Sequence, residues 1–208
     1  PEQISIAFKV KQFAEPSFIQ LVSANDPFGF DVREENSYRR IKPVFELKPF
    51  NQSAILYYYG WQKKGKGYVD YKYVRKGKEF IGKWKVFISR AYGAGEDYPH
   101  QIINKPFVGE PNSVCTETYT MIGPFENEEI AKNVISYINT RFFRFFVMLL
   151  KSTQSAAQKV YSFVPMQDFS KPWTDEELYA KYGLTEEEIA FIESMIRPME
   201  LDEGEKDE

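Results

Sequence analysis

The sequence pattern closest to a catalytic signature is an aspartate followed by a carboxylate-x-lysine pair. Asp31 precedes Glu46-Leu47-Lys48, the order in which many metal-dependent nucleases hold magnesium and orient the attacking water. The pattern is short enough to arise by chance in many chains of this length, and Pro49 directly after Lys48 fits poorly with a central strand. Asp31, Glu46 and Lys48 therefore form an alternative, catalytic hypothesis rather than the leading one.

The sequence contains few of the residues that other catalytic sites and cofactor sites require. The chain has one histidine, His100, and one cysteine, Cys115, which excludes multi-histidine metal sites and cysteine-rich zinc clusters. A Cys115–His100 catalytic pair is formally available, but chance explains two lone residues more simply. No Walker loop is present, and Gly93-Ala94-Gly95 lacks the third glycine of a dinucleotide-binding loop. The sequence thus predicts no cofactor and no metal ion for this chain.

The charged residues are distributed unevenly along the chain. The 208 residues carry a formal net charge of −3. From Arg33 to Lys105 there are 16 Lys and Arg against 7 Asp and Glu, a local balance of +9. From Gln167 to Glu208 the count is 4 against 14, a balance of −10. This division is typical of a polyanion-binding body with an acidic tail, and equally of two solvated faces that differ in charge.

Cations, glycines and aromatic residues alternate between Arg33 and Tyr92, as expected of a surface that binds nucleic acid. Phosphate contacts would give affinity and salt dependence, whereas base recognition needs forked or planar donors on ordered elements. The segment 63–67 is expected to be a basic, mobile loop, for which phosphate binding and plain solvation both stay open. Tyr57 to Tyr59 and Trp61 are available for stacking, although core packing is favoured for any single one. The candidate nucleic-acid-binding residues are Arg33, Arg39, Arg40, Lys63, Lys64, Lys66, Arg75, Lys76, Lys78, Arg90, Tyr92, Gln101 and Asn112, with Arg90, Gln101 and Asn112 as candidates for base contacts.

Strand patterns dominate the elements that would position these residues. Ile4, Ile6, Phe8 and Val10 alternate with polar residues and predict a half-buried strand. A short helix is predicted after Pro16-Ser17. Further strands are predicted over 54–59, 68–74, 85–92 and 114–122, where β-branched and aromatic residues are concentrated.

The C-terminal part of the sequence has helical patterns instead. Asn127 is the predicted N-cap of a helix that continues into the very apolar stretch 142–150, and 159–164 is predicted as a last strand. Thr174 and Thr185 each stand three residues before a glutamate, which is the capping-box signature. Two short acidic helices are therefore expected to close the fold.

These elements predict an α+β fold with a mixed, mainly antiparallel sheet followed by a helical C-terminal third. We expect a domain over 1–165, a helical extension over 166–200 and a disordered acidic tail over 201–208. No run of 18 or more apolar residues is present, so no membrane span is expected. A cytoplasmic location is expected, because no secretory signal is recognisable and the lone Cys115 fits a reducing compartment.

Several ordered sequence motifs carry a family resemblance from about Ser23 to Met199. They are Asn25-Asp-Pro-Phe-Gly-Phe30, Lys85-Val-Phe-Ile-Ser-Arg-Ala-Tyr-Gly93, Glu117-Thr-Tyr119, Ile122-Gly-Pro-Phe125, Asn133-Val-Ile-Ser-Tyr-Ile-Asn-Thr-Arg-Phe-Phe-Arg-Phe145, Val160-Tyr-Ser-Phe-Val-Pro-Met-Gln-Asp-Phe169 and Lys171-Pro-Trp-Thr-Asp175. Together they resemble the C-terminal target-recognition region of bacterial restriction-modification enzymes that have an N6-adenine DNA methyltransferase core.

The resemblance implies a division of labour between this chain and the rest of such an enzyme. The methyltransferase core of that family binds S-adenosylmethionine and grips the flipped adenine with an Asn/Asp-Pro-Pro-Tyr/Phe motif. That motif is missing here, since Asp26-Pro27-Phe28 lacks the second proline. The resemblance therefore implies a non-catalytic module that reads double-stranded DNA, with a catalytic domain or subunit as partner, and with S-adenosylmethionine and magnesium required only by the parent enzyme.

A docking function is the remaining alternative to DNA recognition and to the magnesium nuclease. The aromatic helix expected over 142–150 would then bind a partner protein, and an exposed apolar stripe on that helix would favour this hypothesis. The resemblance instead implies that this stretch packs as scaffold or against the missing catalytic domain.

Overall fold

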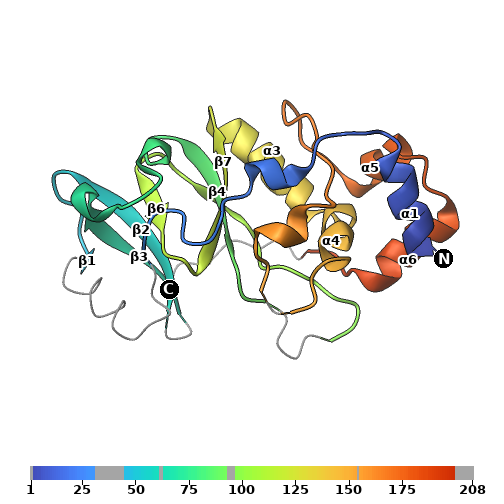
Figure 1. Cartoon of the computed structure of the whole chain (residues 1–208), viewed down its shortest axis with the longest axis horizontal. Helices are drawn as coiled ribbons and strands as arrows, with labels where there is room; N and C mark the ends of the chain where they lie inside the picture. The colour runs from blue at the N-terminus through green and yellow to red at the C-terminus, as the bar shows by residue number, and fades with distance from the viewer. Residues whose placement is uncertain (1, 31–44, 61–62, 93–96, 154, 200–208) are drawn as a thin grey trace, which may run out of the picture.

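The computed structural model describes residues 2–30, 45–60, 63–92, 97–153 and 155–199, with the backbone alone at 45, 59, 60, 63 and 64. The fold is α+β, as the sequence predicts. One end of the elongated molecule is built from β-strands and the other from helices (Figure 1). The expected acidic tail over 201–208 lies outside the described residues.

A four-stranded mixed sheet forms the outer part of the β end. Its strand order is β1-β3-β2-β6, where β1 is Phe45–Glu46, β2 Ser53–Gly60, β3 Lys63–Asp70 and β6 Ser113–Cys115. β3 runs antiparallel to β1 and β2, whereas β6 runs parallel to β2. The segment 63–67, expected as a loop, is the first half of β3, which is a correction. Register explains it, because cross-strand pairing with β2 continues from Ser53–Asp70 to Gly60–Lys63 and satisfies the backbone groups of this segment.

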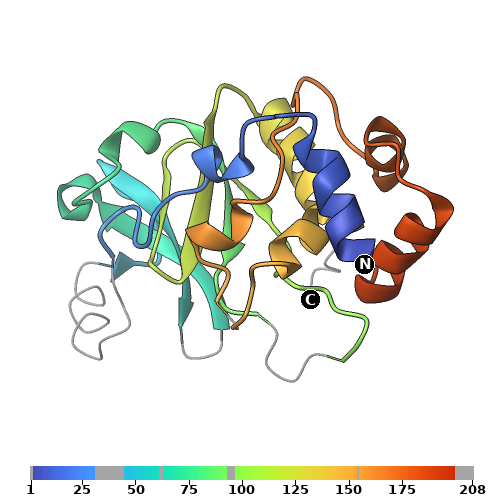
Figure 2. The same cartoon turned by 45° about the vertical axis from the view of Figure 1, so that its right-hand side comes forward.

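A three-stranded antiparallel sheet lies between the first sheet and the helices (Figure 2). Its order is β5-β4-β7, with β5 Phe107–Gly109, β4 Trp84–Ser89 and β7 Tyr119–Phe125. Every residue of β4 after Trp84 is buried, because one face of this central strand packs on the helices and the other on the first sheet. The predicted strand 114–122 is thus two strands, β6 and β7, in different sheets.

The N-terminal segment is a helix, α1 (Glu2–Lys11), so the prediction of a strand there is wrong. The alternating apolar residues divide between two faces of this helix, because residues four apart lie on the same face. Ile6 and Val10 are buried in the core, whereas Ile4 and Phe8 are 75 % and 61 % exposed. A period-two pattern in the sequence therefore arises from one buried and one exposed helical face.

The helical core is organised by α3 (Glu128–Asn139) and α4 (Arg141–Met148). Asn127 caps α3 as predicted, by accepting a hydrogen bond from the Ile130 N–H at 2.9 Å. Thr140 interrupts the predicted continuous helix, since its hydroxyl accepts from the Phe143 N–H at 3.0 Å and starts α4 as a separate helix.

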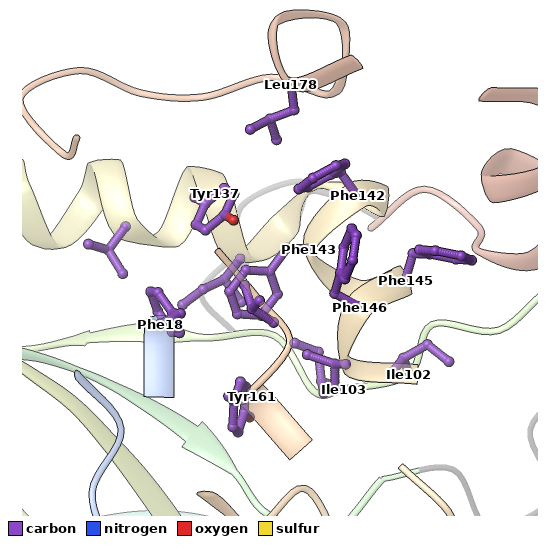
Figure 3. Packing of buried hydrophobic residues seen from close by; sticks show 14 of the residues in the cluster. Phe18, Ile102, Ile103, Tyr137, Phe142, Phe143, Phe145, Phe146, Tyr161 and Leu178 are labelled. Carbon is purple, nitrogen blue, oxygen red and sulfur yellow. The ribbon is translucent and has the colours of Figure 1, made fainter. Parts of the chain in front are cut away.

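The phenylalanines of α4 are buried in this core rather than displayed. Phe142, Phe143, Phe145 and Phe146 are at most 2 % exposed. Figure 3 shows these side chains among residues that come from the whole length of the chain, such as Phe18, Ile103 and Leu178. Residues of α4 therefore form no exposed apolar stripe, which removes the observation that would have favoured docking through this helix.

Short 3₁₀ helices replace two further predicted strand segments. The predicted strand 159–164 is occupied by η5 (Gln158–Tyr161), and the end of the predicted strand 68–74 by η3 (Tyr71–Tyr73). The short helix predicted after Pro16-Ser17 is η1 (Phe18–Leu21), with Ser17 as its N-cap. Another 3₁₀ helix, η4 (Lys78–Phe80), precedes β4.

Two acidic helices, α5 (Asp175–Lys181) and α6 (Glu186–Met195), close the fold as predicted. Both begin with complete capping boxes, Thr174 with Glu177 and Thr185 with Glu188. Leu178, Ile192 and Ile196 join the same hydrophobic cluster as α1, α3 and α4. The domain boundary expected at residue 165 stays a prediction.

Candidate nucleic-acid interface

The predicted phosphate-contacting residues fall into three groups in the structure. Arg33, Arg39 and Arg40 lie outside the described residues, as does Asp31 of the alternative catalytic site. Lys63 and Lys64 begin β3, at the end of the β2–β3 hairpin. The side chains of Lys66, Arg75, Lys76 and Lys78 are described, and all four residues are exposed at the β end of the molecule.

The segment that follows β3 presents its cations from a fixed backbone. The N–H groups of Arg75 and Lys76 both donate to the carbonyl oxygen of Phe28, at 3.1 and 3.4 Å. Gly77 adopts φ = 60°, and a Cβ atom there would lie 2.7 Å from the carbonyl oxygen of Pro27. Only glycine fits this left-handed position in close contact with the backbone. The turn around residues 26–29 therefore anchors the basic segment 75–78.

Further exposed cations of this region were not among the predicted site residues. They are Lys72 on η3 and Lys83 before β4, both exposed. Lys72 forms an ion pair with Asp70 at 3.3 Å and lies over the ring of Tyr73, 5.1 Å from its centroid. Lys76 lies 3.4 Å from the carboxylate of Asp26. Ion pairs formed by solvent-exposed lysines contribute little to stability, so both lysines stay available to an anionic ligand.

Large apolar and aromatic side chains are exposed among these cations. Leu47 is 81 % exposed, and Phe50, Tyr71 and Tyr73 are each more than a third exposed. Tyr71 is held in place by its hydroxyl, which donates to the side-chain oxygen of Asn112. These four residues were not among the predicted site residues. Tyr71 and Tyr73 flank Lys72 just after the end of β3, and this position next to a lysine was the available signal that they are exposed.

The tyrosines that the sequence offered for stacking have structural roles instead. Tyr57 packs on Phe87 and Phe107, and its hydroxyl donates to the Glu110 carboxylate at 2.9 Å. Tyr58 lies over Gly65 of the neighbouring strand, where a Cβ would come within 2.4 Å of its ring. The preference for core packing, which the sequence gave for each single tyrosine, thus fits Tyr57, which packs against the core of the β end. Tyr58 is half-buried against the neighbouring strand.

The residues predicted to read bases use their donors inside the protein. Arg90 is 15 % exposed at its side chain, donates to the Glu117 carbonyl oxygen at 3.2 Å, and lies 3.8 Å from the Glu117 carboxylate. The Asn112 amide donates to Ser53 O at 2.9 Å, and Asn112 itself adopts φ = 69°. Gln101 donates to Ile103 O, and the Tyr92 hydroxyl accepts from Arg197 at 3.0 Å. These contacts give all four side chains roles in holding the fold. Base contact by Arg90, Gln101 and Asn112 stays a prediction, as does nucleic-acid contact by Tyr92.

Lys85 is a charged group that sequence analysis did not single out. It is fully buried on β4, and its Nζ donates to the carbonyl oxygens of Ile81, Glu110 and Ser113 and to the Ser113 hydroxyl, at 3.1 to 3.3 Å. Burial lowers the pKa of its ammonium group to about 8. Because Ser113 belongs to β6, Lys85 links the two sheets. Its ammonium group is buried, so any anionic ligand would be bound by other, exposed cations.

The alternative catalytic residues are only partly placed. Glu46 and Lys48 are both exposed, Glu46 on a two-residue edge strand and Lys48 just after it. Within the described ranges, no three His, Cys, Asp or Glu residues lie close enough together to hold a metal ion. No helix in the described part of the chain is long and apolar enough to cross a membrane.

The helical end carries the opposite charge to the β end. Exposed glutamates lie in the first turns of α5 and α6 and near the end of α6, namely Glu176, Glu177, Glu186, Glu187 and Glu193. The uneven charge distribution of the sequence is therefore also a division in space between two ends of the molecule (Figure 1).

No family model matches the chain, and neither do the curated proteins or the solved structures with which it was compared.

Proposed function

We propose that this chain is a sequence-specific recognition module for double-stranded DNA in a restriction-modification protein, with no catalytic machinery of its own. The observation that carries this proposal is the exposed cationic surface of the β end. Lys66, Lys72, Arg75, Lys76, Lys78 and Lys83 all face solvent there, and several come from a segment with an anchored backbone. Cations on an ordered backbone favour binding to a phosphate backbone, because the protein loses little loop conformational entropy when the ligand binds.

The exposed apolar and aromatic residues support a nucleic-acid ligand over a simple anion. Phe50, Tyr71 and Tyr73 offer flat surfaces between the lysines, and Leu47 offers an apolar edge. Such side chains contact sugars, bases or methyl groups next to the phosphates that the lysines bind. Base specificity then arises from this surface, while the predicted phosphate contacts Arg33, Arg39 and Arg40 lie outside the described ranges.

Chemistry is assigned to other parts of the parent protein. A catalytic domain or subunit would bind S-adenosylmethionine, and magnesium for cleavage, while this chain selects the site. The resemblance of the motifs between Ser23 and Met199 to target-recognition regions supports this division, since none of them is a catalytic signature.

Salt-dependent binding to a duplex oligonucleotide tests the phosphate contacts. The triple variant Lys66→Ala/Lys76→Ala/Lys78→Ala should bind more weakly, and the slope of log affinity against log salt should fall by about 0.9 for each lost contact. The matched control is Lys11→Ala/Lys132→Ala/Lys159→Ala, which removes the same charge from exposed positions elsewhere. Equal losses in the two triple variants would mean that the β end does not bind DNA.

The Glu46→Ala variant separates recognition from the nuclease alternative. If the chain is a recognition module, Glu46→Ala leaves its affinity for duplex DNA unchanged. Neither the unsubstituted chain nor the variant then cleaves DNA in the presence of magnesium. Magnesium-dependent cleavage by the unsubstituted chain that disappears in Glu46→Ala would establish the nuclease instead.

A further inference from the structure

The connection between β1 and β2, residues 47–52, carries the most exposed large apolar side chain in the described part of the chain. Leu47 is 81 % exposed and packs in neither of the two hydrophobic clusters. It lies at the outer end of the β part of the molecule, where β1, β2 and β3 meet (Figure 1). Single exposed apolar residues are common on protein surfaces, so the backbone and the charges around Leu47 decide what it can do.

The backbone on both sides of Leu47 is held by hydrogen bonds. Before it, Glu46 pairs with Tyr68 of β3. After it, the Ser53 hydroxyl accepts from the Phe50 N–H at 3.0 Å and donates to the Phe50 carbonyl oxygen at 2.6 Å. The Ser53 N–H donates to the same carbonyl oxygen at 3.1 Å. Leu47 therefore projects from a short, anchored connection, which loses little conformational entropy when a ligand binds.

Two exposed lysines stand next to this leucine. Lys48 follows it directly. Leu47 leaves β1 one residue beyond the Glu46–Tyr68 pair, which is toward Lys66 in the antiparallel register. The two lysines outnumber the exposed carboxylate of Glu46. An apolar tip between cations is the arrangement with which minor-groove proteins insert a wedge between base pairs while they hold the phosphates.

The predicted base-reading residues favour a recognition mode that needs no hydrogen-bond donor. Arg90, Gln101 and Asn112 all donate to backbone carbonyl oxygens of the protein. Direct readout by these three residues would first require those hydrogen bonds to be broken. A wedge instead responds to how readily a base step unstacks, which depends on sequence without any contact to a base edge.

We propose that Leu47 is a wedge that enters the minor groove of the DNA duplex, partly unstacks one base step and bends the DNA. This inference rests on the proposed function and names one source of its sequence preference. Pyrimidine–purine steps such as TA are easily unstacked, whereas A-tracts are stiff, so the wedge selects a flexible step. Lys48 and Lys66 bind phosphates next to the opened step.

Two end-labelled duplexes of equal length and identical base composition test this proposal. Each has a central block of A·T pairs, arranged as alternating TA steps in one duplex and as an A-tract in the other. The minor groove presents the same acceptors in both blocks, because A·T and T·A pairs are alike there. We expect the chain to bind the TA duplex about fivefold more tightly and to shorten the distance between its ends, measured by fluorescence energy transfer. Cations alone would favour the narrow minor groove of the A-tract.

Substitutions at Leu47 assign the preference to the wedge. Leu47→Ala should abolish the bend and lower the affinity for the TA duplex about fivefold, to that for the A-tract duplex. Leu47→Met should keep both the bend and the preference, because it keeps a large apolar tip. Ile4→Ala is the matched control, since it truncates an apolar residue that is 75 % exposed on α1, and it should change neither. None of these substitutions threatens folding, because both side chains face solvent.

The outcomes separate the wedge from the recognition function on which it rests. Salt-dependent binding in which Leu47→Ala bends and prefers the TA duplex as the unsubstituted chain does would overturn the wedge and leave DNA recognition standing. A preference of the unsubstituted chain for the A-tract duplex would do the same. Failure to bind either duplex at low salt would overturn both proposals.

Discussion

At the scale of single residues, the structure separates cations that hold the fold from cations that are free to meet a ligand. Arg90, Arg144 and Lys85 are buried or nearly so and donate to backbone carbonyl oxygens. The sequence alone does not distinguish these two kinds of cation, because a lysine in a strand with alternating polarity is normally predicted to face solvent. The distinction comes from tertiary packing, in which Lys85 meets acceptors from 4 to 28 residues away.

The buried ammonium group of Lys85 predicts an unusual dependence of stability on pH. Its pKa is about 8 in the folded protein, against about 10.4 in the unfolded chain. Between these values the unfolded state binds more protons, so the free energy of unfolding rises with pH. Urea unfolding at pH 7.5 and 9.5 should show a contribution on the order of 1–2 kcal/mol, which Lys85→Met removes and the exposed control Lys83→Met retains. An identical pH slope in all three proteins would contradict the lowered pKa.

At the scale of elements, the sequence predicts best where local chemistry decides the structure. The Asn127 cap and both capping boxes are confirmed, because a side chain three residues from a free N–H acts without help from the rest of the fold. β2 and β4 were recognisable from their β-branched and aromatic runs. The first half of β3 was not, because its lysines and glycines owe their extended conformation to pairing with β2.

The α1 helix gives a direct test of why the N-terminal prediction failed. A strand would place Ile4 and Ile6 on the same face, whereas the helix exposes Ile4 and buries Ile6 completely. Ile6→Ala should therefore lower the free energy of unfolding by about 2–5 kcal/mol, and Ile4→Ala by less than about 0.5 kcal/mol. Chemical denaturation measures both, and similar losses in the two variants would restore the strand.

The break between α3 and α4 depends on one side chain. Thr140 caps α4 and is itself buried, so Thr140→Ala should cost about 1–2 kcal/mol of stability. Equilibrium unfolding in urea measures this loss. A neutral substitution would indicate that Asp175, whose carboxylate accepts from the N–H groups of Arg141 and Phe142 at 3.0 and 2.9 Å, supports the helix start alone.

At the scale of the whole molecule, opposite charges gather at opposite ends. The charge counts of the sequence predicted this polarity, because the basic and acidic segments of the chain fold into different ends of the molecule. The candidate base-reading residues were the least predictable part of the site. Asn112 illustrates the reason, since its amide fixes a turn with φ = 69° through a contact to Ser53, 59 residues away in sequence.

We propose above all that this chain reads the sequence of double-stranded DNA. Its most direct test is to bind the full chain to a random duplex library at two salt concentrations and to sequence the bound fraction. We expect an enriched motif and an affinity that falls steeply as salt rises, because the protein would contact both base edges and phosphates. Salt-sensitive binding with no enriched motif, or no binding at either concentration, would contradict it.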